Sequence, residues 1–178
     1  MAVSVEDYDQ FIHPIEDRII RCIWRIVRDE HDAEDALQDV LARIWSRRNR
    51  IFKHSNPTAL ILRMCANSAY DILRQRLRRS KAEEALAQQA NSPATQSLPL
   101  KMIVQQEEQA QVLNAIGELG RKQAAAILLR LVEQMPYAQI AVALGCSEVT
   151  ARVHVQRGRE QLRTRLSHMS KDRTANHD

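Results

Sequence analysis

Basic and amide side chains recur at helical spacing near the C-terminus, in a pattern suited to nucleic-acid contacts. Arg152, Gln156, Arg159 and Arg163 follow one another at intervals of three or four residues, so a helix would place them on one face. Arginine can donate two hydrogen bonds to a guanine and glutamine can pair with an adenine, while other arginines neutralise phosphates. We expect Arg152 to read a base and Arg157 to contact a phosphate. The candidate DNA-binding residues of this segment are Ser147, Glu148, Thr150, Arg152, Gln156 and Arg157.

The segments around this face predict a helix-turn-helix. Gly145 suits a left-handed C-cap after a helix over 136–144, and Ser147 suits the N-cap of a helix over 148–167. Two helices joined by a short glycine-containing turn are typical of this motif. Two further helices are expected at 104–117 and 120–134. The inward side of the last helix would be formed by Ala151, Val155 and Leu162.

A second candidate nucleic-acid surface lies between residues 49 and 81. The expected helix over 57–80 ends in a basic tail, in which Arg74, Arg76, Arg78, Arg79 and Lys81 can neutralise phosphates. Its outer stripe is predicted to be Asn67, Tyr70, Asp71, Arg74 and Arg78, with Asn67 able to read a base edge.

The preceding loop, 49–56, carries residues that can stack on a base and hydrogen-bond to it. These are Phe52, Lys53, His54 and Asn56. Ser55 or Asn56 is expected to cap the helix that starts at Pro57.

A third charged feature is acidic and belongs to a helix predicted to begin near Asp32, its expected N-cap. Its exposed face would carry Glu34, Asp35, Gln38 and Asp39. Carboxylates repel phosphates, so this face suits a basic protein surface better than nucleic acid. Before it, a helix over 5–28 is expected, with His13-Pro14 as a kink or break.

Charge alternates along the chain in four blocks. Residues 1–40 carry net −7, residues 41–81 net +10, residues 82–118 net −4 and residues 119–178 net +5. Two basic blocks separated by an acidic one predict two places that meet a polyanion.

Composition favours helices: aromatic residues are 4% of the 178, and there are four glycines and five prolines. No apolar run is long enough to span a bilayer and no export signal is evident, so a soluble intracellular, cytoplasmic protein is expected. Cys22, Cys65 and Cys146 form no CxxC pair, which indicates reduced thiols and no metal site.

The chain is expected to be all-α, with two small helical domains joined by a flexible linker. Residues 88–99 contain two prolines, no charge and no helical periodicity, the signature of a linker. We therefore predict an N-terminal helical bundle over 1–82, a linker over 83–103, a four-helix domain over 104–168 and a disordered tail over 169–178. The acidic N-terminal block is expected to cover the basic recognition helix in the free protein.

Three segments resemble the extracytoplasmic-function (ECF), or group-four, sigma factors of bacterial RNA polymerase. The first is Asp32–Trp45, which resembles the second-helix signature of the family. The second is Asn67–Arg74 with its basic tail, and the third is Tyr137–Arg165. Departures from the family pattern occur at Leu60, where tryptophan is frequent, and at Val149, where a small residue is frequent. A further departure is at 120–123, which replace a Leu-Pro entry.

The resemblance implies a sigma subunit whose N-terminal domain is like sigma region 2 and whose C-terminal domain is like region 4. It implies that the acidic face binds the clamp helices of the largest polymerase subunit and that the C-terminal domain meets the flap of the second subunit. It assigns the −10 element to the N-terminal domain, through Phe52, Lys53, His54, Asn56, Asn67, Arg74, Arg78 and Arg79. It assigns the −35 element to the helix-turn-helix. It also implies an anti-sigma factor as a partner, and neither a cofactor, a metal nor a membrane.

Two other hypotheses remain open from the residues alone. A free-standing helix-turn-helix regulator with an N-terminal sensor or dimerisation bundle would explain the C-terminal half, and it would bind a palindrome unaided. A helical adaptor would leave both basic blocks unexplained. An enzyme is not expected, because the sequence has no phosphate loop, no HExxH and no readable nucleophile–His–acid grouping.

Overall fold

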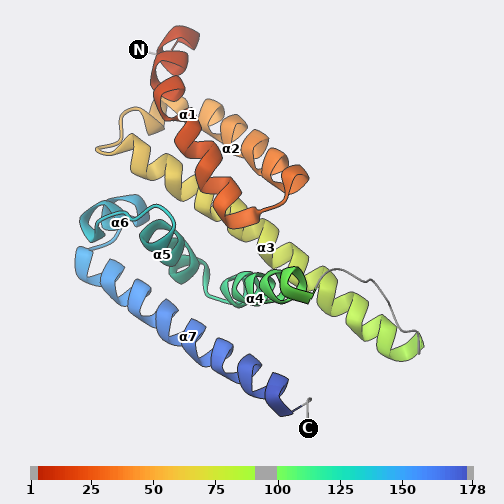
Figure 1. The fold of residues 1–178 in the computed structure, drawn as a ribbon. Helices are drawn as coiled ribbons and strands as arrows, with labels where there is room; N and C mark the ends of the chain where they lie inside the picture. The colour runs from red at the N-terminus through yellow and green to blue at the C-terminus, as the bar shows by residue number, and fades with distance from the viewer. Residues whose placement is uncertain (1–3, 91–99, 176–178) are drawn as a thin grey trace.

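The computed structural model describes residues 4–90 and 100–175, which form seven α-helices and no strand (Figure 1). Three helices belong to the N-terminal part and four to the C-terminal part. Their bounds are α1 Val5–Val27, α2 Glu30–Ile51, α3 Pro57–Ala90, α4 Leu100–Gly117, α5 Arg121–Leu131, α6 Tyr137–Leu144 and α7 Glu148–Ala175. The all-α prediction is confirmed. In these residues no helix combines the length and apolarity needed to cross a membrane.

Helix α1 is continuous, so the break predicted at His13-Pro14 is wrong. Ser4 caps its start and forms a capping box with Asp7. Pro14 lies inside the helix but is exposed, as is Gln10, whose carbonyl lacks its usual partner because proline has no N–H. Water can satisfy a carbonyl at that position, so the helix continues.

Helix α2 begins three residues earlier than expected, because Asp29 rather than Asp32 is its N-cap. The Asp29 carboxylate accepts a hydrogen bond of 3.0 Å from the Asp32 N–H, and this bond lowers the pKa of Asp29. Asp32 instead pairs with Arg76 on α3, at 2.5 Å. Arg76 also lies 3.4 Å from the Asp29 carboxylate, so it joins both acids at the start of α2 to α3.

Helix α3 is the long central helix, and it extends ten residues beyond its predicted end. Asn56 caps it through a 3.0 Å bond from the Ala59 N–H, and Pro57 is its first residue, as predicted. The extension over 81–90 is rich in Ala, Gln, Glu and Lys, which are strong helix formers. The start of the predicted linker is therefore helical. Residues 91–99, its middle part, lie outside the described residues.

The C-terminal helices follow the predicted order. Gly145 is left-handed (φ 66°) and ends α6, and Ser147 accepts from the Thr150 N–H at 3.1 Å to begin α7. Helix α4 begins at Leu100, earlier than the start predicted at residue 104. Helix α7 reaches Ala175, so most of the tail predicted to be disordered over 169–178 is helical, and 176–178 lie outside the described residues.

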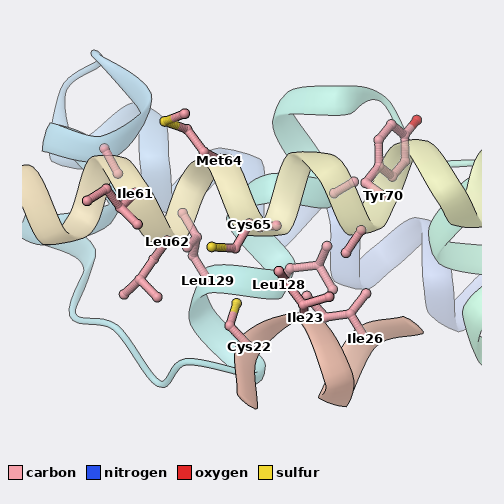
Figure 2. Close-up of a cluster of buried hydrophobic side chains, with 14 of the residues drawn as sticks. Cys22, Ile23, Ile26, Ile61, Leu62, Met64, Cys65, Tyr70, Leu128 and Leu129 are labelled. Carbon is pink, nitrogen blue, oxygen red and sulfur yellow. The ribbon is translucent and has the colours of Figure 1, made fainter. Parts of the chain in front are cut away.

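The two sets of helices pack against each other along α3. On one side α3 contacts α1 and α2, and on the other it contacts α4, α5 and α6 (Figure 1). Buried side chains from both parts join in one cluster, in which Ile23 and Ile26 of α1 and Leu128 and Leu129 of α5 lie near α3 (Figure 2). The two domains are thus docked rather than separate in this structure.

Candidate polymerase and nucleic-acid interfaces

The acidic surface of α2, made of Glu34, Asp35, Gln38 and Asp39, lies on the outer side of the helix. The first three side chains are exposed, whereas the apolar positions of α2 face α1 and α3. The exposed carboxylates of Glu34 and Asp35 are available to a basic partner. Three of the four predicted residues are thus exposed and Asp39 is half-buried, and the binding of polymerase by this surface stays a prediction.

Asp39 differs from its neighbours because it also supports the fold. One carboxylate oxygen accepts a 3.0 Å hydrogen bond from the hydroxyl of Ser68, the buried polar residue of α3, and the other pairs with Arg43 at 2.8 Å. A substitution at Asp39 would leave Ser68 without its acceptor. Asp39 is therefore a poor residue for testing the surface alone.

A polar groove separates α2 from α3. It holds about 1000 Å³ and both walls carry both signs of charge: Asp35, Asp39 and Arg43 line it from α2, and Asp71, Arg78 and Arg79 line it from α3. A partner at this groove would therefore meet acidic and basic side chains together.

The 52–56 loop is more engaged than its sequence suggests. The Phe52 ring packs against Phe11, with centroids 4.5 Å apart, and is near Tyr8. The Asn56 N–H donates to His54 Nδ1 at 3.2 Å, while the Asn56 side chain caps α3. In this arrangement Phe52 is a packing residue and its predicted stacking on a base is not available. Lys53 is the exposed member of the four.

The outer stripe predicted for α3 is wrong in its first half. Tyr70 is buried and its hydroxyl donates to the Leu119 carbonyl at 2.7 Å, and Asp71 pairs with Arg121 of α5. Asn67 is half-buried on the same helix. Periodicity could not show this because the covering surface comes from the other domain.

The basic tail of α3 is divided between exposed and engaged residues. Arg74, Arg78 and Arg79 are exposed, as expected for phosphate contacts. Arg76 instead joins α3 to Asp29, Asp32 and the Val27 carbonyl, and Lys81 pairs with Glu118 at 2.6 Å. The predicted phosphate roles of Arg76 and Lys81 are therefore not supported.

The recognition face of α7 is exposed as predicted. Its six candidate residues are all exposed: Ser147, Glu148, Thr150, Arg152, Gln156 and Arg157. On the opposite side of the helix, Ala151 and Val155 are buried and Leu162 packs on the core.

Arg152 is held in place before any DNA binds. It pairs with Glu148 at 2.6 Å and its guanidinium lies 4.4 Å from the centre of the Tyr137 ring. A preset orientation reduces the side-chain entropy lost on binding. Two residues further along α7, burial and the positive charges of Lys122 and Arg157 lower the pKa of the His154 imidazole.

Comparison with known proteins also divides the chain into an N-terminal and a C-terminal part. The family model of sigma-70 region 2 matches residues 11–79, and that of sigma-70 region 4 matches residues 109–162. The RNA polymerase sigma-E factor of Streptomyces coelicolor is 28% identical over 92% of this chain and 88% of its own length. The ECF RNA polymerase sigma factor SigE of Mycolicibacterium smegmatis is 26% identical over 95% of this chain and 65% of its own length. The chain is an ECF sigma factor of the sigma-70 family.

Two solved structures share the fold of this sigma factor. The sigma factor RpoE of Bartonella quintana, in complex with the anti-sigma factor NepR, has a TM-score of 0.52 at 23% identity and covers 92% of this chain and 98% of its own. CnrH, in complex with the cytosolic domain of CnrY, has a TM-score of 0.54 at 17% identity and covers 92% and 90%. Members of the sigma-70 family are regulatory DNA-recognition proteins.

Arginines of the N-terminal domain of this sigma factor hold helix ends of the C-terminal domain. Arg25 donates to the Val132 carbonyl at the end of α5 (3.2 Å), and Arg63 donates to the Ala143 carbonyl near the end of α6 (2.5 Å). Arg18 pairs with Glu133 at 3.0 Å. Cations are favourable at helix C-termini, where unpaired carbonyls carry partial negative charge. Burial lowers the pKa of Arg63.

These three arginines were missed by the sequence analysis, since no local pattern marks a residue whose partner lies in another domain. The docked arrangement also shows that the prediction that the acidic N-terminal block covers the recognition helix is wrong. Helix α7 packs on α4, α5 and α6, and it lies on the side of them away from α1 and α2 (Figure 1). The docking instead covers part of α3.

Proposed function

We propose that this sigma factor binds core RNA polymerase through the acidic surface of α2 and directs it to promoters with two separate elements. The observation that carries the proposal is the presence, in one chain, of an exposed acidic surface and two exposed basic surfaces on different domains. A polymerase subunit that must bind a protein and two pieces of DNA needs all three. A free-standing regulator would leave the acidic surface unexplained.

The N-terminal domain is assigned to the −10 element. Arg74, Arg78 and Arg79 would neutralise phosphates, and Lys53 lies exposed in the loop before α3. Asn67, His54 and Asn56 remain candidates for base contact, although Asn67 is half-buried and the other two bond each other in the docked state. The His54–Asn56 bond and the packing of Phe52 on Phe11 lie within the N-terminal domain, so base contact by these side chains needs a local change in the loop.

The C-terminal domain is assigned to the −35 element through the outer face of α7. Arg152 can break its ion pair with Glu148 and bind a guanine, because the guanidinium can donate two hydrogen bonds to the O6 and N7 atoms of that base. Ser147 and Thr150 lie at the start of the helix, where side chains and N–H groups can meet a phosphate. The flap of the second polymerase subunit is the proposed protein contact of this domain.

The docked arrangement is assigned to the free protein. Two elements separated by about two turns of DNA lie roughly 70 Å apart. A packed chain of this size is about 40–50 Å across. The domains must therefore separate for simultaneous contact, and binding to core polymerase is proposed to shift the population toward the open state.

An anti-sigma factor is proposed as a partner, since the sigma factor RpoE of Bartonella quintana, which shares this fold, was solved in complex with the anti-sigma factor NepR. Action in the cytoplasm, beside polymerase and promoter DNA, follows from the same proposal, and no catalytic step is assigned to the chain.

Run-off transcription with core polymerase on a library of promoter fragments tests the proposal. Transcripts that start at discrete sites and require this protein are expected. The alternative regulator would instead bind a palindromic fragment tightly without polymerase and would yield no transcripts of its own.

A further inference from the structure

Two cysteine thiols of the N-terminal domain face each other in the core. The Cys22 sulfur points from α1 toward the Cys65 sulfur on α3, and both residues are 0% exposed (Figure 2). Both cysteines are free thiols. Within residues 4–90 and 100–175 no group of three or more His, Cys, Asp or Glu side chains is arranged to hold a metal ion.

The C-terminal domain forms the cover over this pair. Leu129 of α5 lies beside the two cysteines in Figure 2, and Glu133 follows α5 in the loop before α6. The Glu133 side chain is only 5% exposed and is paired with Arg18, one helical turn before Cys22. The thiols are therefore shielded by contacts between the domains, and separation of the domains would uncover them.

The docked state also keeps Cys22 in its unreactive form. Hydrogen bonding with the Cys65 thiol, burial and the negative charge of Glu133 together raise the pKa of Cys22 well above its usual range. The thiolate is the nucleophile, so a protonated and buried thiol reacts slowly with oxidants. When the two domains separate, Glu133 and the apolar side chains that cover Cys22 move away with the C-terminal domain.

We propose that Cys22 and Cys65 are an oxidation site, in which a hydroperoxide converts the two thiols to a disulfide between α1 and α3 when the domains separate. The inference depends on the opening of the docked domains and not on promoter recognition. Under oxidising conditions, the Cys22–Cys65 disulfide would mark those molecules of the free protein whose domains have separated.

The reaction balances with hydrogen peroxide as the oxidant. The thiolate of one cysteine attacks an oxygen of the peroxide, the O–O bond breaks, and a sulfenic acid and one water form after proton transfer. The second thiol then attacks the sulfenic sulfur, forms the S–S bond and releases a second water. Two thiols lose two electrons in total and one peroxide is reduced to two waters.

Peptide mapping tests the site directly. The three cysteines fall in separate tryptic peptides, 22–25, 64–74 and 131–152. Reduced full-length protein is treated with hydrogen peroxide, alkylated, digested and examined for the linked pair 22–25 and 64–74. The link is expected in the wild type and in Cys146→Ser, and it is expected to be absent from Cys22→Ser.

The gating is tested with a matched pair of tyrosine variants. Tyr70→Phe removes the interdomain bond to Leu119, whereas Tyr8→Phe changes a tyrosine whose ring packs within the N-terminal domain. The link should form about fivefold faster in Tyr70→Phe, the factor expected for one hydrogen bond of ordinary net strength, and at the wild-type rate in Tyr8→Phe. Arg63→Gln, with the second peptide read as 54–74, provides an independent opening variant.

Two results would overturn the proposal. Equal rates in the wild type and both opening variants would show that the docked domain does not gate the thiols. Absence of the 22–65 link in both opening variants, while urea-unfolded protein forms it under the same peroxide treatment, would show that the native pair is not an oxidation site.

Discussion

The hydroxyl of Tyr70 donates a 2.7 Å hydrogen bond to the backbone carbonyl of Leu119, and both residues are buried. Tyr70 belongs to α3 of the N-terminal domain, and Leu119 lies in the turn between α4 and α5 of the C-terminal domain. The bond therefore joins the two DNA-binding units of this sigma factor. The bond forms on the helix proposed to meet the −10 element, while Arg74, Arg78 and Arg79 of the same helix stay exposed in the docked state.

Tyr70→Phe is expected to shift the free protein toward the open state. The change removes the donor to the buried Leu119 carbonyl, which costs the docked state about 1 kcal/mol, the net strength of an ordinary hydrogen bond. Small-angle X-ray scattering should show a larger radius of gyration than in the wild type, while Tyr8→Phe should match the wild type. A radius unchanged by Tyr70→Phe would argue that this bond does not hold the domains together.

The double variant Glu34→Arg with Asp35→Arg is expected to abolish binding to core polymerase while the helix content stays the same. Both side chains are exposed, and exposed substitutions usually change stability by less than about 0.5 kcal/mol. Asp39 is left unchanged because it accepts the Ser68 hydrogen bond. The matched control is Glu16→Arg with Asp17→Arg, which makes the same charge change on exposed positions of α1. Co-purification with core polymerase distinguishes them, and equal recovery of both variants would contradict the interface.

Arg152→Ala is expected to weaken recognition of the upstream element by roughly 1–3 kcal/mol and to relax its sequence preference. Arg157→Ala should weaken binding to all sequences about equally and should reduce the salt dependence, as loss of a phosphate contact does. Binding titrations of the polymerase complex on matched and scrambled −35 fragments, at several salt concentrations, measure both effects. Identical preference and salt slope in the two variants would show that the recognition face is assigned wrongly.

Gly158→Ala is expected to destabilise the C-terminal domain by about 1 kcal/mol. A Cβ at this position would lie 2.7 Å from Cγ1 of Ile127, so α5 and α7 would have to move apart. Overpacking of this kind costs about 1–3 kcal/mol, and the better helix propensity of alanine offsets about 1 kcal/mol.

The control for this variant is Gly117→Ala, whose Cβ would meet its neighbours at ordinary contact distances of 3.5–3.6 Å. Urea unfolding followed by circular dichroism gives the free energy of unfolding of both variants. If Gly158→Ala were as stable as Gly117→Ala, the close approach of α5 and α7 would not need glycine.

The local features of this fold could be predicted from sequence because their causes are local. Apolar periodicity located the helices, Gly145 and Ser147 marked the turn of the helix-turn-helix, and Asn56 with Pro57 marked the start of α3. The exposed acidic surface of α2 followed from the same periodicity.

The remaining features depend on partners far away in the chain. Asp32 pairs with Arg76 of α3 while Asp29 caps α2, and the Phe52 ring packs against Phe11 and is not free to stack on a base. Tyr70 is buried against the C-terminal domain, and Asp71, which is partly exposed, pairs with Arg121 of that domain. Each of these outcomes required knowing which surfaces meet, and helical periodicity does not contain that information.

The most direct test of the central claim is the distance between the two domains with and without core polymerase. Fluorophores on Ser46→Cys of α2 and Gln161→Cys of α7, both exposed positions, are attached in a Cys146→Ser background in which Cys22 and Cys65 stay buried. Energy transfer should be high in the free protein and should fall when core polymerase and promoter DNA are added. Unchanged energy transfer in a complex that produces run-off transcripts would contradict the account, because the docked domains would then recognise a promoter without separating.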